Sequence, residues 1–357
     1  MTYFPESVVI LSVDGIQFKT CGNQHPSDFI IARPKYIPTQ EVFSNKFLLT
    51  NIFNKDFNRL NLWQNKEELK YYLASFKQNY SKYIHYSKDH KTWFFAVPKN
   101  LIKQFFDPNK GLKKLLSLPE SKKDFHINNS LEFVEFLTKS GVSIDDLGIT
   151  FSTLVGYHNS NHSDINVVIY GKDNAWKIIN FLKTTKHSKL RWKTEGEWEE
   201  FRMKRNRKNL FTKDEFLKQM SRKRTEGFFN NTLFVLFPVE KEEEVWEKWG
   251  EEEFFPLGTA EIEGVVTNNF NSLIRPGYYE IKNSKTLNGK KVPIKKIVFY
   301  SRDYVMQALP KEKIRARGLL EKVVNKKTNK SYYRLVIGYF DSYLNERRGT
   351  EFIKTKW

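Results

Sequence analysis

Residues 146–171 read DLGITFSTLVGYHNSNHSDINVVIYG. Two apolar runs, 147–150 and 165–170, flank a polar segment, and Gly171 ends the second run. Short β-branched runs bounded by turn residues predict strands. Residues 175–182 then have apolar positions at helical spacing. The segment therefore predicts the order strand, turn, strand, helix.

Four residues of this segment are suited to phosphate or metal chemistry. Ser152 at a tight turn can offer its hydroxyl to phosphate oxygens, with Gly156 beside it on the same turn. Asp164 and Asn166 alternate along the second strand, so both face the same side and could share Mg²⁺. Structural alternatives remain open, because Ser152 could cap a helix and Asp164 could cap the turn before its strand.

The pattern resembles the signature of the polymerase-beta-type nucleotidyltransferase superfamily, a Gly-Ser turn followed by an Asp-x-Asp strand. The resemblance implies nucleoside triphosphate binding through Ser152 and Gly156, Mg²⁺ at Asp164, and catalysis of nucleoside monophosphate transfer by Asp164 and Asn166. Two metals would then stabilise the attacking and leaving oxygens.

The sequence departs from that signature at two positions. Phe151 stands where the superfamily has Gly, and Asn166 stands where it has the second acid. A third acid is expected on a neighbouring strand, but residues 232–238 carry none, so Asp145, Asp146 and Glu240 are the candidates to test. Loss of a metal ligand predicts weak or absent catalysis.

The rest of the chain resembles uncharacterised archaeal proteins described as predicted nucleotidyltransferases. The matching elements are Gly22-x-x-His25-Pro26, Lys35-Tyr36-x-Pro38, Asp107-Pro108 with Gly111-Leu112, Arg275-Pro-Gly-Tyr-Tyr279, 317–323 and 332–338. No chemistry is assigned to His25, for which we favour a structural role.

Charge favours a polyanionic partner. Lys and Arg number 60 against 41 Asp and Glu, a net charge of +19 that suits RNA or nucleotide phosphates. We expect nucleic-acid contact from a helical basic stretch, although such a stretch can also be a solvated helix face. Its candidate residues are Arg202, Lys204, Arg205, Arg207, Lys208, Arg222, Lys223 and Arg224.

The single Cys21 indicates a reducing compartment, and the N-terminus lacks signal-peptide features. No apolar stretch is long enough to span a bilayer. We therefore expect a cytoplasmic protein without membrane contact. His158 and His162 have the i, i+4 spacing of metal ligands, but no third ligand accompanies them. The oligomeric state is not predicted.

We expect an α+β protein with three domains. The first, 1–120, begins with two strands around Asp14-Gly15 and an irregular path through Pro34 and Pro38. The second, 121–255, is the nucleotidyltransferase-like mixed sheet with helices, including a helix at 131–139 capped by Asn129 or Ser130. The third, 256–357, carries short strands that suggest a small antiparallel sheet or barrel.

Three functions are compatible with the sequence. The chain could bind nucleotide or RNA with little or no catalysis, as the two departures favour. It could instead be an active Mg²⁺-dependent transferase acting on an RNA, a protein or a small acceptor. It could also be a non-catalytic interaction module that docks through its basic surface.

Overall fold

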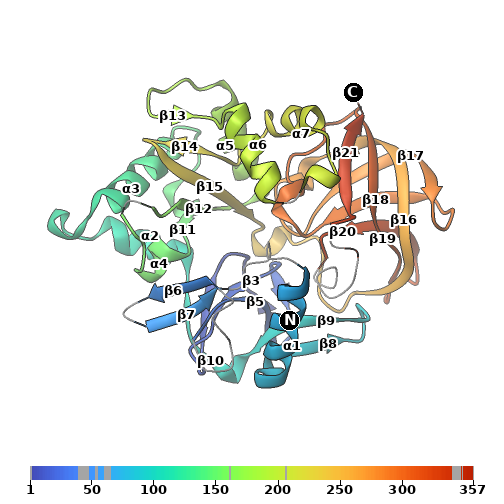
Figure 1. Ribbon diagram of the computed structural model, residues 1–357, viewed down its shortest axis with the longest axis horizontal. Coiled ribbons are helices and arrows are strands. Elements are labelled where there is room, and N and C mark those ends of the chain that lie inside the picture. Colours follow the sequence, from blue (N-terminus) through green and yellow to red (C-terminus); the bar gives the residue numbers. More distant parts are fainter. Residues whose placement is uncertain are drawn as a thin grey trace. The chain divides into compact units, whose positions relative to one another are not determined.

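The computed structural model describes residues 2–38, 48–52, 55–59, 66–160, 162–205, 207–339, 347 and 349–356 of the 357-residue chain. Mixed sheets and helices form an α+β fold, as predicted (Figure 1). None of the described helices is long and apolar enough to cross a membrane.

Contacts between residues divide the chain into two compact units, each made of three segments. Unit 1 contains Met1–Ile84, Phe95–Trp192 and Arg224–Val245. Unit 2 contains His85–Phe94, Lys193–Lys223 and Trp246–Trp357. Unit 1 therefore draws on the first two predicted domains, and most of unit 2 on the third.

The first sheet of unit 1 has the antiparallel strand order β10-β2-β3-β5-β7-β6, and β9 also pairs with β5. Its strands are β2 (Val9–Ser12), β3 (Gln17–Thr20), β5 (Phe29–Pro38), β6 (Leu48–Ile52), β7 (Lys55–Arg59), β9 (Thr92–Pro98) and β10 (Ile102–Phe106). A separate small pair joins β1 (Thr2–Tyr3) to β4 (Gln24–His25). The predicted hairpin around Asp14-Gly15 is confirmed as β2 and β3.

The sequence predicts an extended, irregular path at Pro34 and Pro38, and both prolines lie within the extended strand β5. The strand accommodates them through an irregularity in its pairing with β3. Gln17 pairs with Tyr36 and Phe18 with Pro34, so Lys35 is one extra residue, as in a β-bulge. Bulges bend a strand and redirect a side chain.

The second sheet of unit 1 has the order β11-β12-β15-β14-β13. Strands β12 and β15 are parallel, and the other neighbours are antiparallel. The strands are β11 (Leu147–Ile149), β12 (Ile165–Tyr170), β13 (Leu190–Arg191), β14 (Glu226–Phe229) and β15 (Thr232–Val239). The predicted strand at 165–170 is confirmed.

Helices cover one face of this sheet, where Phe133 of α3 (Phe125–Thr138) packs on Phe234 with ring centroids 4.5 Å apart. Helix α5 (Lys172–Thr184) contacts β12 and β15 and contains the predicted helix at 175–182. On the other face, Val168, Val235 and Phe237 cluster with Val9 of β2. Each sheet of unit 1 therefore contributes to one buried layer.

Helix α3 begins earlier than predicted. Its N-cap is Asp124, whose side chain accepts a hydrogen bond from the Ile127 N–H at 2.8 Å. Asn129 and Ser130, the predicted caps, are buried within the helix, and Asn129 Nδ2 donates to Thr232 Oγ1 at 2.8 Å. Unit 1 also contains α1 (Lys66–Asn79), α2 (Pro108–Leu116) and α4 (Ser152–Val155).

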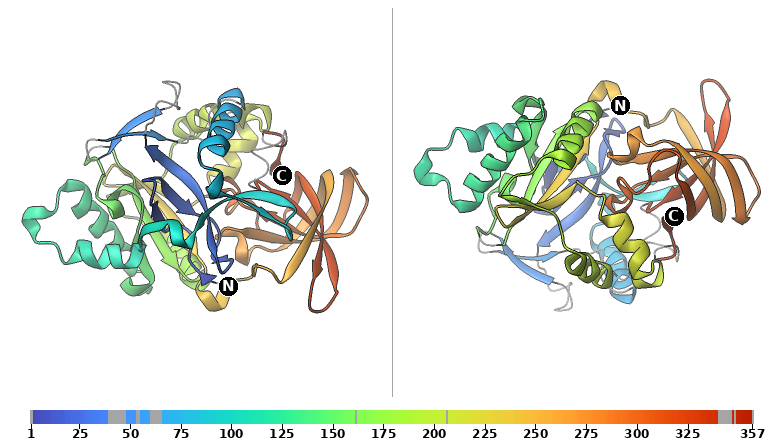
Figure 2. Two further views of the ribbon diagram at one scale, coloured as in Figure 1. Left: turned by 90° about the horizontal axis from the view of Figure 1, so that it is seen from below. Right: turned by 90° about the horizontal axis from the view of Figure 1, so that it is seen from above.

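Unit 2 is built on a sheet of order β16-β17-β18-β20-β19-β21, in which β16 also pairs with β19. Five of its strands therefore form a ring, seen in two further views in Figure 2. The strands are β16 (Glu252–Asn268), β17 (Gly277–Asn288), β18 (Ile294–Phe299), β19 (Lys313–Asn325), β20 (Ser331–Ile337) and β21 (Phe352–Lys356). The unit also holds α6 (Glu195–Lys204) and α7 (Lys213–Met220), and β8 (Ile84–Ser87) pairs with β9.

A buried ionic group is attached to the ring. Arg334 of β20 is fully buried, and its guanidinium donates to Glu321 at 2.9 Å and to Glu247 at 2.7 Å. The same guanidinium lies 4.3 Å from the ring centroid of Phe254. Removing one member of a buried pair leaves an uncompensated charge, which costs more than the pair itself contributes.

We predict that Arg334→Met lowers the free energy of unfolding by about 3–5 kcal/mol, because Glu321 then stays buried without its cation. Urea denaturation measures the change. The double variant Arg334→Met/Glu321→Leu should recover much of the loss, since it removes the cation together with its fully buried partner and leaves only the more exposed Glu247 unpaired. Equal losses in the single and double variants would contradict this account.

Candidate functional site

The turn that resembles the Gly-Ser signature has an unusual backbone. Phe151 has φ 60° and ψ −130°, a conformation that glycine adopts freely and that strains a residue with a side chain. Its ring is buried beside Phe237 of β15, with centroids 5.2 Å apart. Phe151 therefore keeps the backbone conformation of a glycine while placing an aromatic ring in the site.

Ser152 is the first residue of α4, whose N-cap is Phe151, so the alternative in which Ser152 caps this helix is not what the structure shows. The Ser152 hydroxyl is half-buried and has no hydrogen-bond partner among the described residues. Gly156 ends α4 in the left-handed conformation, with φ 89°. Glycine tolerates this conformation without strain, which gives Gly156 a structural role in the turn.

Asp164 and Asn166 lie at the start of β12, as predicted. Asp164 is exposed, whereas Asn166 is 8% exposed and donates from Nδ2 to the Asp164 carbonyl at 3.0 Å. Asn166 shares its face of the sheet with Val168, and hence with Phe151. The structure thus brings the turn and the Asp164 strand together on one face.

One carboxylate on this face was missed by the sequence analysis. Asn166 pairs with Val235, and Val235 pairs with Glu226 of β14, so all three side chains face the same side. Glu226 is buried. No clear signal in the sequence marks β14, because the strand is short, starts with an acid and follows charged residues.

The three acids proposed from the sequence lie at the wrong end of the sheet. Tyr170 pairs with Val239, so Glu240 follows the carboxyl end of β15, whereas Asp164 precedes the amino end of β12. Asp145 and Asp146 precede β11, whose Leu147 pairs with Ile169. At about 3.3 Å per residue, these carboxylates are roughly 20 Å from Asp164.

The described residues do not fit a two-metal site. Among them there is no group of three or more His, Cys, Asp or Glu side chains placed to hold a metal ion. Glu226 is separated from Asn166 by the intervening Val235 strand, so neighbouring acids do not converge on Asp164. No magnesium-dependent step follows from this arrangement.

Lysines instead converge on the turn. The Lys35 ammonium lies 4.1 Å from the ring centroid of Phe151, and the Lys19 ammonium lies 4.8 Å from the same centroid. Lys19 also lies 4.7 Å from the Phe237 centroid and 3.8 Å from a Glu6 oxygen. Both lysines therefore make a cation–π contact with the Phe151 ring.

Lys35 is the more perturbed of the two. Burial lowers its pKa, and the charges of Arg59 and Arg33 lower it further, to about 7, while Asp164 opposes the shift. Arg33 of β5 lies directly opposite Lys19 of β3 in the sheet. A bulge residue whose pKa is lowered to about 7 by burial and by two arginines is a candidate site residue.

Two tyrosines flank this group. Tyr36 packs edge to face on Tyr157, with centroids 5.7 Å apart, and Arg59 lies 6.0 Å from the Tyr36 centroid. Burial and the contact with Tyr36 raise the pKa of Tyr157. The Tyr157 hydroxyl therefore stays protonated and can donate a hydrogen bond at neutral pH.

His158 lies outside this group. Its Nε2 contacts Asp124 Oδ2 at 2.9 Å, and its ring stacks on His126 with centroids 5.1 Å apart. Asp124 also accepts from Ser160 Oγ at 2.6 Å. The contact of His158 with a helix cap indicates a structural role.

The predicted basic residues form internal contacts in unit 2. Arg207 pairs with Asp303, which also lies 3.8 Å from Arg205, and Lys223 Nζ donates to the Asp303 carbonyl at 2.6 Å. Burial alone would raise the pKa of Asp303, but these cations outweigh it and hold that pKa well below its usual range.

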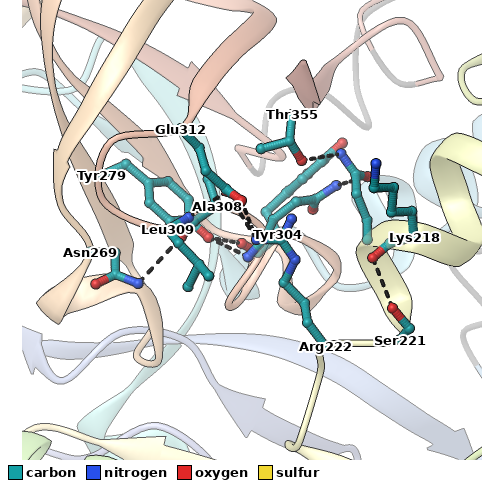
Figure 3. Close-up of polar contacts among 12 residues, drawn as sticks. Lys218, Ser221, Arg222, Asn269, Tyr279, Tyr304, Ala308, Leu309, Glu312 and Thr355 are labelled. Carbon is teal, nitrogen blue, oxygen red and sulfur yellow. Dashed lines mark hydrogen bonds and ion pairs between the residues drawn. The ribbon is translucent and has the colours of Figure 1, made fainter. Parts of the chain in front are cut away.

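The other basic residues predicted to contact nucleic acid differ from one another in their contacts. Arg222 points to Glu312, with 2.9 Å between the charged groups (Figure 3), and Arg202 pairs with Glu199 at 2.7 Å. In unit 1, Arg224 lies 4.6 Å from the Trp192 ring centroid. Lys204 is exposed, and the Lys208 side chain lies outside the described part of the chain. Nucleic-acid contact by this set stays a prediction.

Comparison with known proteins shows a relative that matches almost the whole chain. The chain is 28% identical over 340 residues to the uncharacterized protein MJ1086 of Methanocaldococcus jannaschii, covering 94% of this chain and 96% of that protein. No family model matches the chain. No solved structure matches it.

The strain at Phe151 can be measured by comparing the stabilities of its glycine and alanine variants. We predict that Phe151→Gly is more stable than Phe151→Ala by about 1–2 kcal/mol, because only glycine relieves the backbone strain. Both variants lose the buried ring, so both are less stable than the native protein by roughly 2–5 kcal/mol.

Phe237, on regular strand backbone, is the matched control. There the glycine variant should be the less stable of the two by about 0.5–1 kcal/mol. Chemical denaturation of the four variants gives both differences. The same order at both positions would show that Phe151 is unstrained.

Proposed function

We propose that unit 1 is a nucleotidyltransferase-like module that binds a nucleotide through its phosphate groups, with weak or no transfer activity. Lys35 and Lys19 contact phosphate oxygens, and the Ser152 hydroxyl donates to one of them. The observation that carries the proposal is the convergence of cations at this turn. Lys19 and Lys35 lie against the Phe151 ring, and the charges of Arg59 and Arg33 act on Lys35. Glu6 lies close to Lys19, and the charge of Asp164 acts on Lys35.

Electrostatics explains why an anion suits this group. Burial, together with the charges of Arg59 and Arg33, makes the protonated form of Lys35 costly in the free protein and lowers its pKa to about 7. A bound polyphosphate supplies the missing negative charge and keeps that proton in place. Tyr36 and Tyr157 are aromatic surfaces beside the same group, suited to a base or a ribose.

The missing acids argue against efficient transfer. Asp164 is exposed, Asn166 is neutral, and Glu226 is separated from both by β15. Transfer of nucleoside monophosphate to an RNA, a protein or a small acceptor is the second candidate, favoured by Asp164 at the motif position. An interaction module without a nucleotide is the third.

Lys35→Met is predicted to weaken binding of ATP and of inorganic triphosphate by roughly 10–100-fold, the usual loss for one charge-assisted contact. Calorimetric titration at pH 6.5 measures both affinities. Lys139→Met, an exposed lysine of unit 1 outside the site, is the control and should leave them unchanged. Mg²⁺-dependent turnover that is lost in Asp164→Ala would establish the transferase instead, and absence of ATP binding would leave the interaction module.

Binding should also depend on pH. Because Lys35 must be protonated to bind an anion and its pKa is about 7 in the free protein, affinity falls as pH rises from 7 to 9, by at most about tenfold per unit. Lys35→Arg keeps its charge throughout this range, so its affinity should change less. The same pH profile in the two proteins would exclude titration of Lys35.

A further inference from the structure

The strand order of unit 2 is that of a known binding architecture. Counted from β16, the ring runs first, second, third, fifth and fourth strand, and only its third and fifth strands, β18 and β20, are parallel. A five-stranded Greek-key ring is the architecture of the OB fold, whose second and third strands bind oligonucleotides. In this ring those strands are β17 and β18.

The hairpin formed by these two strands carries unneutralised positive charge. Residues 282–295 contain no Asp or Glu, and five lysines in this range are exposed: Lys282, Lys285, Lys290, Lys291 and Lys295. The side chains of these five lysines form no hydrogen bond or ion pair with the described residues. Glu263, which lies opposite Lys285 on β16, already pairs with Lys356.

The hairpin lysines differ from the basic residues that the sequence predicts on a helix. Arg202, Arg207 and Arg222 each bind a carboxylate of unit 2, so their charge is used within the fold. Unit 2 holds most of the net positive charge of the chain. On the hairpin, that charge is left available to a partner.

Aromatic residues lie at the foot of the hairpin. Tyr278 of β17 packs on Trp246 with ring centroids 4.7 Å apart, and the Lys296 ammonium of β18 lies 4.5 Å from the Tyr278 centroid. Both rings are half-buried, so part of each faces solvent. Cations interleaved with aromatic rings are typical of sites where single-stranded bases stack and phosphates pair with lysine.

We propose that the β17–β18 hairpin of unit 2 binds single-stranded nucleic acid, with Lys285, Lys290 and Lys291 on the phosphates and Tyr278 against a base. This inference does not depend on nucleotide binding by unit 1, which uses other residues. Charge selects the partner class, since a protein partner would have to present a continuous acidic strip along an extended hairpin.

The test measures binding of the full chain to labelled 20-nucleotide oligo(U) and oligo(dT), and to a duplex, between 50 and 200 mM salt. Lys285→Ala/Lys290→Ala/Lys291→Ala should lower single-strand affinity at least tenfold and reduce the salt slope by about 2, at about 0.7 per lost phosphate contact. The matched control, Lys114→Ala/Lys139→Ala/Lys177→Ala, removes the same charge from exposed helix and turn positions of unit 1.

Equal losses in the two triple variants would overturn the proposal, because they would show attraction to net charge alone. No single-strand binding by the native chain, or a preference for the duplex, would overturn it as well. Tyr278→Ala should weaken binding roughly 5–100-fold with an unchanged salt slope, as expected for lost stacking. Retained ATP binding in the hairpin variant distinguishes this result from a failure of the unit 1 site.

Discussion

Packing on the inner face of the second sheet holds the turn at Phe151 in a conformation that this residue would not adopt alone. Strain of about 1–3 kcal/mol at one residue persists only where surrounding contacts exceed it. Burial of the Phe151 ring against Phe237, Val168 and Val235 supplies those contacts. The same packing places the Phe151 ring against Lys19 and Lys35 of the first sheet, so the geometry of the site depends on this one buried ring.

Parallel pairing of β12 and β15 then decides which polar groups can act together. Because the two strands run in the same direction, residues after β15 lie beside the end of β12 and residues before β15 lie beside its start. Glu240 therefore belongs to a separate ionic group with Lys172, at 3.3 Å, and Asp146 pairs with Lys241. The start of β12 is left with Asp164, Asn166 and the cations of the first sheet.

Local patterns in the sequence predicted much of the second sheet. The run at 165–170, the strand within Thr232–Val239 and the helix after Gly171 are all present, since each has a clear apolar period. Lys35 could not be predicted as a site residue, because its position depends on a bulge between β3 and β5. Pairing irregularities arise from contacts between distant segments, which a periodicity within one segment does not record.

Charge gave the least reliable guide to the site. In the sequence, Arg202, Arg205 and Arg207 form a dense basic run. In the fold, acids of the same unit neutralise this run: Glu199 pairs with Arg202, and Asp303 pairs with Arg207 and lies close to Arg205. Lys35 differs, because it is a single lysine in the mostly apolar strand β5, where burial and the charges of Arg59 and Arg33 lower its pKa. Cations that the fold neutralises contribute to stability, whereas cations that the fold leaves repelling or unpaired raise the affinity for an anion. The two proposed sites therefore rest on cations that the fold brings together with aromatic rings, and not on the local density of basic residues in the sequence.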